Sequence, residues 1–244
     1  SMSLTILPRL SMAKLTINEG VDFLWVDLEH RPFDAYEVRW VPVLCRMKDC
    51  ACVVRVAGLD PQLIKKALDI GANTIMVPQV GTAEEAALAV RYAKYPPVGS
   101  RGVSPLWTSY LDVSWDDYLP AANDETCVIV QIETPEGIRN LDEIARVDGV
   151  DVVFAGPMDL AASLGHIGRP GHAEVQKYLA DFPARVAACG KTAGITFADP
   201  NACERAYQQG YRLISFGTIL LHGSRGIAAE LKRFRALETG RGTE

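Results

Sequence analysis

The chain has 244 residues, of which 48% are hydrophobic and 23% are charged, a composition typical of globular proteins with a substantial core. The net charge of −5 argues against nonspecific binding to nucleic acid, and the absence of a run of about 18 apolar residues argues against a membrane span. The six cysteines form no C-x-x-C pair, so the cysteine spacing of a zinc site is absent, and reduced thiols in the cytoplasm are the simplest interpretation.

Short β-rich segments alternate with amphipathic segments along the chain. We expect strands near Leu4–Leu7, Phe23–Asp27, Cys52–Val56, Thr74–Val77, Val128–Ile132, Val152–Ala155, Ala193–Thr196 and Leu213–Phe216. We expect helices over Asp60–Ile70, Thr82–Ala93, Pro135–Val147, Ala173–Cys189, Pro200–Gln209 and Ser224–Leu237. Asp60 can cap its helix, Gly71 can end it, and Thr82 with Glu85 has the spacing of a capping box.

This alternation predicts an α/β protein with a (β/α)8 TIM barrel, formed by residues 1–244 as a single domain. The expected strands are nearly continuous apolar runs, which is typical of parallel strands covered on both faces. An open doubly wound sheet is the alternative, but no glycine-rich turn follows the first expected strand. The long connections over residues 95–126 and 157–172 are expected to be functional loops and not linkers between domains.

Polar residues gather where the expected strands end, which is the active face of a barrel. They are Asp27, Glu29, His30, Arg55, Gln131, Glu133 and Asp159. The spacing of Gln131 and Glu133 places both side chains on one face of a strand. Crowded carboxylates repel one another unless a cation neutralises them, and oxygen ligands favour Mg²⁺ or Mn²⁺. The alternative is that Glu133 and Asp159 are helix caps or ion-pair partners.

The positions of the lysines disfavour a mechanism that uses a lysine amine. A Schiff-base aldolase requires a lysine on the active rim. None of the lysines ends an expected strand; they are Lys14, Lys48, Lys65, Lys66, Lys94, Lys177, Lys191 and Lys232. Lys191 precedes the seventh strand and therefore belongs to the opposite face.

Six segments of the chain together resemble the HpcH/HpaI aldolases, a family of metal-dependent (class II) pyruvate aldolases. They are DFLWVDLEH (22–30), VVRV (53–56), LDIGANTIMVPQV (68–80), RYAKYPPVGSRGV (91–103), VIVQIETPEG (128–137) and GVDVVFAGPMDLAASLG (149–165). The resemblance extends from about Gly20 to Leu237. It implies a barrel, a divalent cation (Mg²⁺, Mn²⁺ or Co²⁺) without an organic cofactor, and a homo-hexamer built as a dimer of trimers.

The resemblance also implies roles for individual residues. Glu133 and Asp159 match the metal ligands, and Gln131 matches the glutamine beside the metal. Arg55 matches the arginine that contacts the keto oxygen, and His30, paired with Asp27, matches the acid–base histidine. The cradle of the pyruvate carboxylate matches Gly156, Pro157, Met158 and Asp159.

Each of these roles has a structural alternative. His30 can order the turn before Arg31-Pro32, Arg55 can form an ion pair with Asp27 or Glu29, and Gln131 can satisfy a buried amide elsewhere. His166 and His172 are expected to be loop or subunit-contact residues.

Two positions depart from the family pattern. Met158 stands where the family often has alanine, and Ile219 stands near the position of a common aspartate. In the last expected helix, the apolar stripe packs on its own barrel or, if the helix is exchanged between subunits, on a neighbour's; it comprises Ile227, Ala228, Leu231, Phe234 and Leu237.

The resemblance implies an aldehyde-lyase of aromatic or sugar acid catabolism. It would reversibly cleave a 4-hydroxy-2-oxo acid to pyruvate, or a close 2-oxo acid, and an aldehyde. A CoA-ester lyase of the citrate lyase beta or malyl-CoA lyase type is the alternative, but no clear basic cluster exists for the phosphates of CoA. A noncatalytic barrel is disfavoured by the intact set of acids, arginine and histidine.

Overall fold

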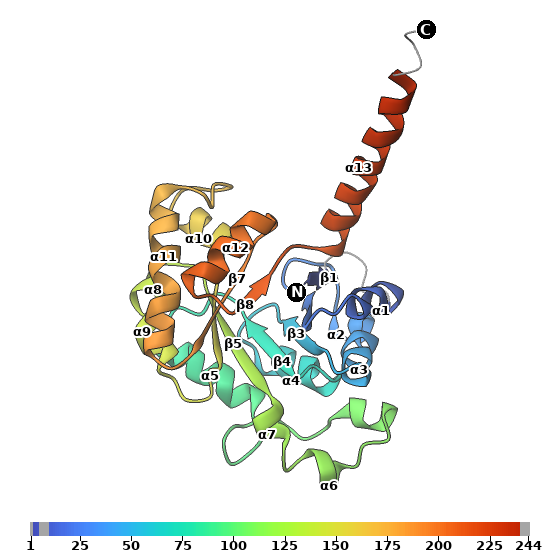
Figure 1. Cartoon of the computed structure of the whole chain (residues 1–244). Helices are drawn as coiled ribbons and strands as arrows, with labels where there is room; N and C mark the ends of the chain where they lie inside the picture. Colours follow the sequence, from blue (N-terminus) through green and yellow to red (C-terminus); the bar gives the residue numbers. More distant parts are fainter. Residues whose placement is uncertain (1, 5–9, 240–244) are drawn as a thin grey trace.

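The computed structural model describes residues 2–4 and 10–239, and its centre is a curled parallel sheet (Figure 1). Eight strands follow one another in chain order, each paired with the next. They are β1 (Met2–Leu4), β2 (Phe23–Asp27), β3 (Ala51–Arg55), β4 (Thr74–Val77), β5 (Cys127–Ile132), β6 (Val152–Ala155), β7 (Thr192–Thr196) and β8 (Leu213–Ser215). The strands expected from β2 onward are confirmed to within one residue. The first expected strand, Leu4–Leu7, lies outside the described residues except for Leu4, with which β1 ends.

Side chains along the strands alternate between two apolar clusters. One cluster is made by strand residues alone, centred on Phe23, Trp25, Val53, Met76, Ile129, Val152 and Phe154. The other contains the alternate strand positions together with helix residues such as Ile64, Leu68 and Phe182. The first cluster therefore lies on the concave face of the sheet and the second lies under the helices. Asp27, Arg55 and Gln131 follow Trp25, Val53 and Ile129 by two residues, so they continue the concave face.

Helices cover the convex face of the sheet (Figure 1). The helices of this layer are α1 (Leu10–Asn18), α2 (Ala35–Val38), α3 (Trp40–Met47), α4 (Pro61–Asp69), α5 (Ala83–Ala93), α8 (Pro135–Arg139), α9 (Leu141–Ala145), α10 (Pro157–Ser163), α11 (Ala173–Ala188) and α12 (Pro200–Gln209). They are followed by α13 (Ile219–Thr239), which does not join the layer. The connection over residues 95–126 carries the short turns η1 (Leu106–Tyr110), α6 (Trp115–Tyr118) and α7 (Ala122–Glu125). Asp60 caps α4, and Thr82 with Glu85 forms the expected capping box of α5.

Two expectations about this helical layer were wrong. The helix expected over Pro135–Val147 is divided at Asn140, whose side-chain amide donates to the Gly81 carbonyl oxygen at 2.8 Å. The connection over residues 157–172 was expected to be a loop, but it begins with α10. Pro157 lies in the first turn of that helix, where a missing N–H costs no hydrogen bond.

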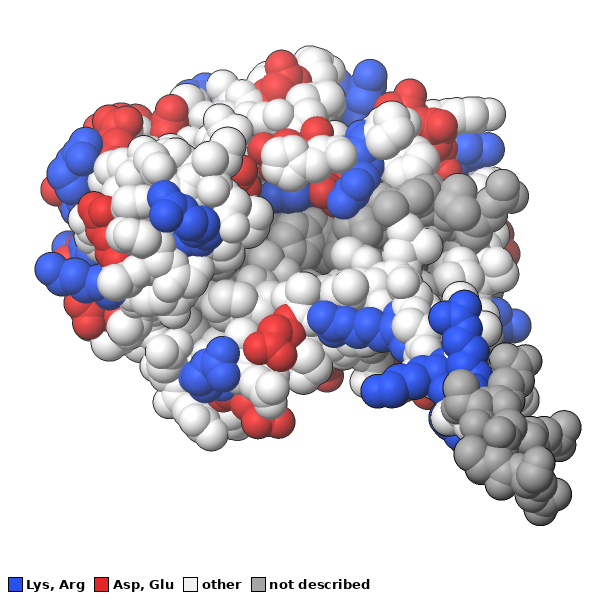
Figure 2. Space-filling model, turned by 90° about the horizontal axis from the view of Figure 1, so that it is seen from above, with Lys and Arg blue, Asp and Glu red and all other residues white. Residues whose placement is uncertain are grey.

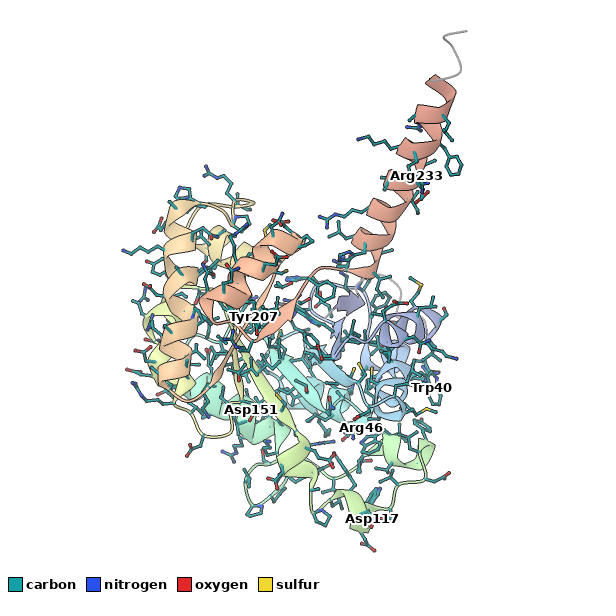
Figure 3. The ribbon with its side chains drawn as sticks, in the orientation of Figure 1. Trp40, Arg46, Asp117, Asp151, Tyr207 and Arg233 are labelled. Carbon is teal, nitrogen blue, oxygen red and sulfur yellow. The ribbon has the colours of Figure 1, made fainter. Side chains whose placement is uncertain are left out.

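The last helix, α13, projects away from the sheet, with Arg233 near the middle of its projecting part (Figure 3). It begins at Ile219, five residues before the expected start at Ser224. The side chains of Ile227, Leu231 and Phe234 are 65%, 48% and 65% exposed. The apolar stripe of this helix therefore does not pack on its own sheet.

One acid at the amino-terminal end of the sheet has a structural role. Asp151 lies at the amino-terminal end of β6, where its carboxylate accepts a hydrogen bond from the Val128 N–H at 2.8 Å (Figure 3). This bond connects the start of β5 to the start of β6.

Among the helices in residues 10–239, none combines the length and the apolar character needed to cross a membrane.

Candidate active site

The site lies at the carboxyl ends of the strands and is organised by a buried arginine. Seen from above, this face of the molecule is hollowed near its middle (Figure 2). The parallel register of β2 and β3 places Asp27 beside Arg55. The Arg55 guanidinium donates from Nε to Asp27 Oδ1 at 2.9 Å and from Nη2 to Asp27 Oδ2 at 2.8 Å. Burial alone would raise the pKa of Asp27, but the hydrogen bonds and charge of Arg55 lower it, so Asp27 is ionised.

A second carboxylate, that of Glu29, faces the same guanidinium. Its Oε2 lies 3.0 Å from Arg55 Nη1, and the half-exposed imidazole of His30 approaches it to 3.6 Å. Burial raises the pKa of Glu29, and the nearby charges of Asp27 and Asp159 act in the same direction against Arg55 and His30. Arg55 therefore lies between two acids that compete for one positive charge.

The expected pairing of the His30 imidazole with Asp27 is not what the structure shows. Asp27 is occupied by the fork of Arg55 and by the backbone N–H groups of Glu29 and His30, at 3.1 and 3.4 Å from Oδ1. The imidazole turns instead toward Glu29. The two structural alternatives are both present, since Arg55 forms the ion pair and His30 also takes part in the turn after β2.

An amide relays this network to the fifth strand. Arg55 Nη1 donates to Gln131 Oε1 at 3.3 Å, and Gln131 Nε2 donates to Glu133 Oε2. The second oxygen of Glu133 accepts from the backbone N–H of Gln79 at 2.9 Å. Gln79 has φ of 57°, a left-handed conformation that a residue with a side chain rarely adopts, and this conformation directs its N–H at the carboxylate. A strand of the dry core thus ends in an amide and an acid because they complete a polar chain.

Glu133 is the least compensated charge of the site. Burial, followed by the charges of Asp159 and Glu29, raises the pKa of Glu133 to about 7, against the lowering effects of Arg55 and the Gln79 N–H. Asp159 is exposed in the first turn of α10, close enough to Glu133 and Glu29 to act on both. A buried carboxylate among like charges is stabilised when a cation binds it. The acids at the ends of β5 and β6 therefore fit a divalent ion.

Gly156 allows the chain after β6 to approach this carboxylate. A Cβ atom at position 156 would lie 2.5 Å from Glu133 Oε2 and 2.7 Å from Gln131 Nε2, closer than real contacts permit. The Ser163 hydroxyl donates to the Glu133 carbonyl oxygen at 3.0 Å, which fixes α10 to the end of β5. The start of α10, with Pro157, Met158 and Asp159, is thereby held beside the polar chain.

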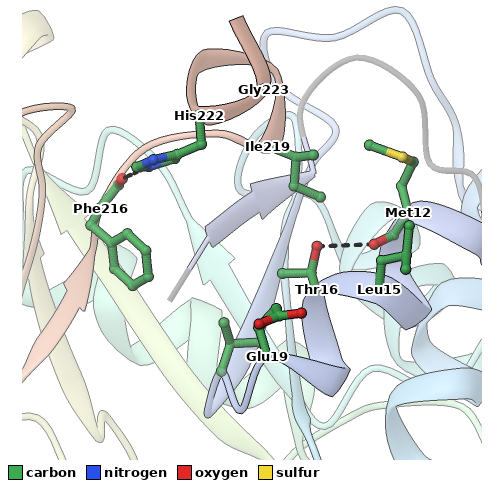
Figure 4. A pocket seen from close by; sticks show the side chains of 9 residues that line it. Met12, Leu15, Thr16, Glu19, Phe216, Ile219, His222 and Gly223 are labelled. Carbon is green, nitrogen blue, oxygen red and sulfur yellow. Dashed lines mark hydrogen bonds between the residues drawn. The ribbon is translucent and has the colours of Figure 1, made fainter. Parts of the chain in front are cut away.

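The two departures from the family pattern lie in different places. Met158 is 54% exposed and adds an apolar side chain next to Asp159. Ile219 lines an apolar pocket with Met12, Leu15 and Phe216, and none of the residues of that pocket belongs to the acid cluster described above (Figure 4). Met158 thus affects the rim of the site, whereas Ile219 contributes to packing at the base of α13.

Two contributors to the site had no catalytic or binding role assigned from the sequence. Glu29 was expected at the active face and as a possible ion-pair partner of Arg55, and Gln79 had no assigned role. Both follow strand ends by two residues, which was the available signal. The Gln79 side chain links Glu29 to the Glu133 end of the polar chain, because its Nε2 donates to Glu29 Oε1 at 3.4 Å.

Comparison with known proteins identifies the family of the chain. A family model described as HpcH/HpaI aldolase/citrate lyase matches residues 7–222. A 4-hydroxy-2-oxo-heptane-1,7-dioate aldolase of Klebsiella pneumoniae is 42% identical over 221 residues, covering 89% of this chain and 83% of the relative. A pyruvate aldolase of Rhizobium etli is 41% identical over 228 residues, covering 91% and 89%.

Solved structures with the same fold are found as well. An HpcH/HpaI aldolase/citrate lyase family protein from Burkholderia cenocepacia J2315 superposes with a TM-score of 0.89 at 35% identity, covering 96% of this chain and 94% of that protein. Macrophomate synthase superposes with a TM-score of 0.84 at 25% identity, covering 99% and 86%. The resemblance carried by the six sequence segments is confirmed, and the chain belongs to the HpcH/HpaI aldolase/citrate lyase family.

Proposed function

We propose that the chain is an aldehyde-lyase that reversibly cleaves a 4-hydroxy-2-oxo acid to pyruvate, or a close 2-oxo acid, and an aldehyde. The observation that carries the proposal is the polar chain from Arg55 through Gln131 to Glu133, which ends in a buried carboxyl group with a raised pKa. Relatives at about 40% identity are named as aldolases of 4-hydroxy-2-oxo acids and of pyruvate, which supports the same chemistry.

Glu133 and Asp159 would hold a divalent cation such as Mg²⁺, Mn²⁺ or Co²⁺, and no organic cofactor is needed. Both donors are carboxylate oxygens, which suit a hard ion. When bound, the ion supplies Lewis-acid polarisation of the carboxylate and keto oxygens of the substrate. Gly156, Pro157 and Met158 form the adjoining turn, and we assign this turn to the substrate carboxylate.

Arg55 is assigned to the keto oxygen of the substrate. A guanidinium has five N–H groups. Two bind Asp27, one binds Gln131, and the second on Nη1 faces Glu29. Among the described residues, one N–H on Nη2 is left for a substrate oxygen. The surrounding acids and the face of Trp25, 5.0 Å from the guanidinium carbon, fix the direction of that donor.

His30 is assigned to the proton transfer. It takes the proton of the C4 hydroxyl as the C3–C4 bond breaks and the aldehyde carbonyl forms. The electron pair of the broken bond passes to C3 and the keto oxygen, where Arg55 stabilises the negative charge. A proton then reaches C3 to give pyruvate. Because His30 is half-exposed and contacts Glu29, it can exchange protons with solvent and with that acid.

The proposal extends to the assembly of the chain. We propose a single (β/α)8 barrel over residues 1–244, closed between β1 and β8, that forms a hexamer. The exposed stripe of α13 supports exchange of this helix onto a neighbouring subunit. Small-molecule acids and aldehydes are the expected partners, and the six free cysteines support a reducing cytoplasm.

A screen of 4-hydroxy-2-oxo acids for pyruvate release tests the function. We expect EDTA to abolish cleavage and added Mg²⁺, Mn²⁺ or Co²⁺ to restore it, and we expect Glu133→Gln to remain inactive with all three. Full activity in EDTA, together with borohydride trapping of a pyruvate adduct, would show that an amine and not a cation carries the reaction.

A further inference from the structure

A cluster of side chains that could ligate a metal ion lies outside the site described above, where the connection between α10 and α11 meets the first turn of α11. His166 and His172 lie six residues apart, yet their rings stack with centroids 3.5 Å apart and an interplanar angle of 23°. The backbone creates this approach. The His172 N–H donates to the Arg169 carbonyl oxygen at 3.0 Å, and the Arg169 N–H donates to that of His166 at 2.9 Å. Gly168, with φ of 73°, provides the left-handed residue that the turns require.

Glu174, in the first turn of α11, completes the cluster. Its Oε2 lies 2.8 Å from His166 Nε2. One ligand atom from each of His166, His172 and Glu174 lies within 4.8 Å of the others. The α10–α11 connection therefore gathers two imidazoles and a carboxylate around one point.

We propose that His166, His172 and Glu174 form a second cation site, which takes a borderline transition-metal ion such as Zn²⁺. Two nitrogen donors and one oxygen donor suit Zn²⁺ better than Mg²⁺, and three protein ligands leave one position open for water. The chemistry differs from that of Glu133 and Asp159, whose donors are oxygens alone. The two sites would therefore select different ions.

The existing hydrogen bonds indicate which contacts a bound ion would replace. His166 Nε2 and Glu174 Oε2 are already hydrogen-bonded, and an ion with bonds of about 2.0–2.2 Å to each replaces the shared proton after a small separation of the two atoms. His172 Nδ1 accepts the Glu174 N–H at 3.3 Å, so the neutral ring carries its proton on Nε2. Binding through Nδ1 exchanges this long capping bond for a metal bond.

An ion bound at this site would cross-link the α10–α11 connection to the first turn of α11. Gly165, Gly168 and Gly171 make the unfolded connection flexible, so a bond between its two ends removes more conformational freedom than in a stiffer loop. α10 and α11 contact each other, and α10 carries Asp159. Zn²⁺ at the cluster would therefore stabilise the segment that follows the active-site helix.

Calorimetric titration with ZnCl₂ tests the proposal in a Glu133→Gln background, which disables the oxygen site. We expect about one Zn²⁺ per chain. His172→Asn keeps a helix-capping acceptor and His166→Gln keeps a hydrogen bond to Glu174, yet each should lower Zn²⁺ affinity at least about 10-fold. The matched control is His222→Gln, since His222 is a half-buried histidine bonded to the Phe216 carbonyl oxygen, and it should leave affinity unchanged.

Thermal unfolding of the same proteins gives an independent measure. Zn²⁺ should raise the Tm of the Glu133→Gln protein and of its His222→Gln derivative, but not that of the His172→Asn derivative. The proposal is overturned if the Glu133→Gln protein binds no Zn²⁺. It is equally overturned if the loop variants bind Zn²⁺ as tightly as their parent.

Discussion

The raised pKa of Glu133 makes the stability of the metal-free protein depend on pH in an unusual direction. The pKa of this buried carboxyl is about 7 in the folded chain, against an ordinary value of 4.5. Between these values the folded state binds more protons than the unfolded state. Stability is therefore fully present below about pH 4.5 and is lost as the pH rises to about 7. The pKa difference corresponds to about 3 kcal/mol.

Glu133→Gln removes this titration. The variant keeps an oxygen for the Gln79 N–H, but its amide nitrogen faces Gln131 Nε2, and an unsatisfied donor costs about 1–3 kcal/mol. That cost does not change with pH. We therefore expect the difference in unfolding free energy, variant minus wild type, to be about 2.5 kcal/mol larger at pH 8 than at pH 5.

Urea unfolding in EDTA at pH 5 and pH 8 measures this change. Adding Mg²⁺ at pH 8 should stabilise the wild type and leave Glu133→Gln unaffected, because a ligand stabilises only the state that binds it. Equal pH dependence of the two proteins in EDTA would refute the reasoning, since Glu133 would then titrate alike in the folded and unfolded chains.

The other predictions concern geometry, proton transfer, charge and assembly. Gly156→Ala should displace the Glu133 carboxylate, destabilise the fold by about 1–3 kcal/mol and weaken cation binding. Gly58→Ala, on the same rim but with open space around it, should have none of these effects. Equal cation affinities of the two variants in calorimetry would contradict this prediction. His30→Ala should lower kcat by about 10²–10⁴-fold with unchanged cation affinity, and a loss of cation would show that His30 is a ligand. Arg55→Lys should raise KM and lower kcat together, because an ammonium cannot replace the fork on Asp27; an effect on KM alone would argue against a role in bond cleavage. Phe234→Glu should reduce the particle mass in light scattering, and an unchanged mass would place the subunit contacts elsewhere.

The fold was largely predictable because strand periodicity is a local property. Apolar runs located the strands, and a period of two placed Gln131 and Glu133 on one face before any contact was known. The parallel register then brought Asp27 beside Arg55, as the shared strand ends implied. These predictions needed only spacing along the chain.

Partner choice within the cluster was not predictable in the same way. Spacing brought His30 near Asp27, but it could not show that the Arg55 fork would occupy that carboxylate and leave the imidazole to Glu29. Such choices depend on competition among donors over differences of less than 1 Å. The start of α10 at Pro157 was missed for a related reason, since the glycine-rich segment after it favoured a loop.

Charge balance explains why this arrangement calls for a cation. Asp27, Glu29, Glu133 and Asp159 would together carry four negative charges if all were ionised, and Arg55 returns one, which leaves −3. Gln131 joins the two halves without adding charge, because its carbonyl oxygen faces the guanidinium and its amide faces the carboxylate. A divalent ion beside Glu133 reduces the excess to −1. The proton that His30 takes from the substrate leaves an equal negative charge on the enolate, so the transfer moves charge within the site without changing its sum, and Arg55 is assigned to the oxygen on which that charge develops.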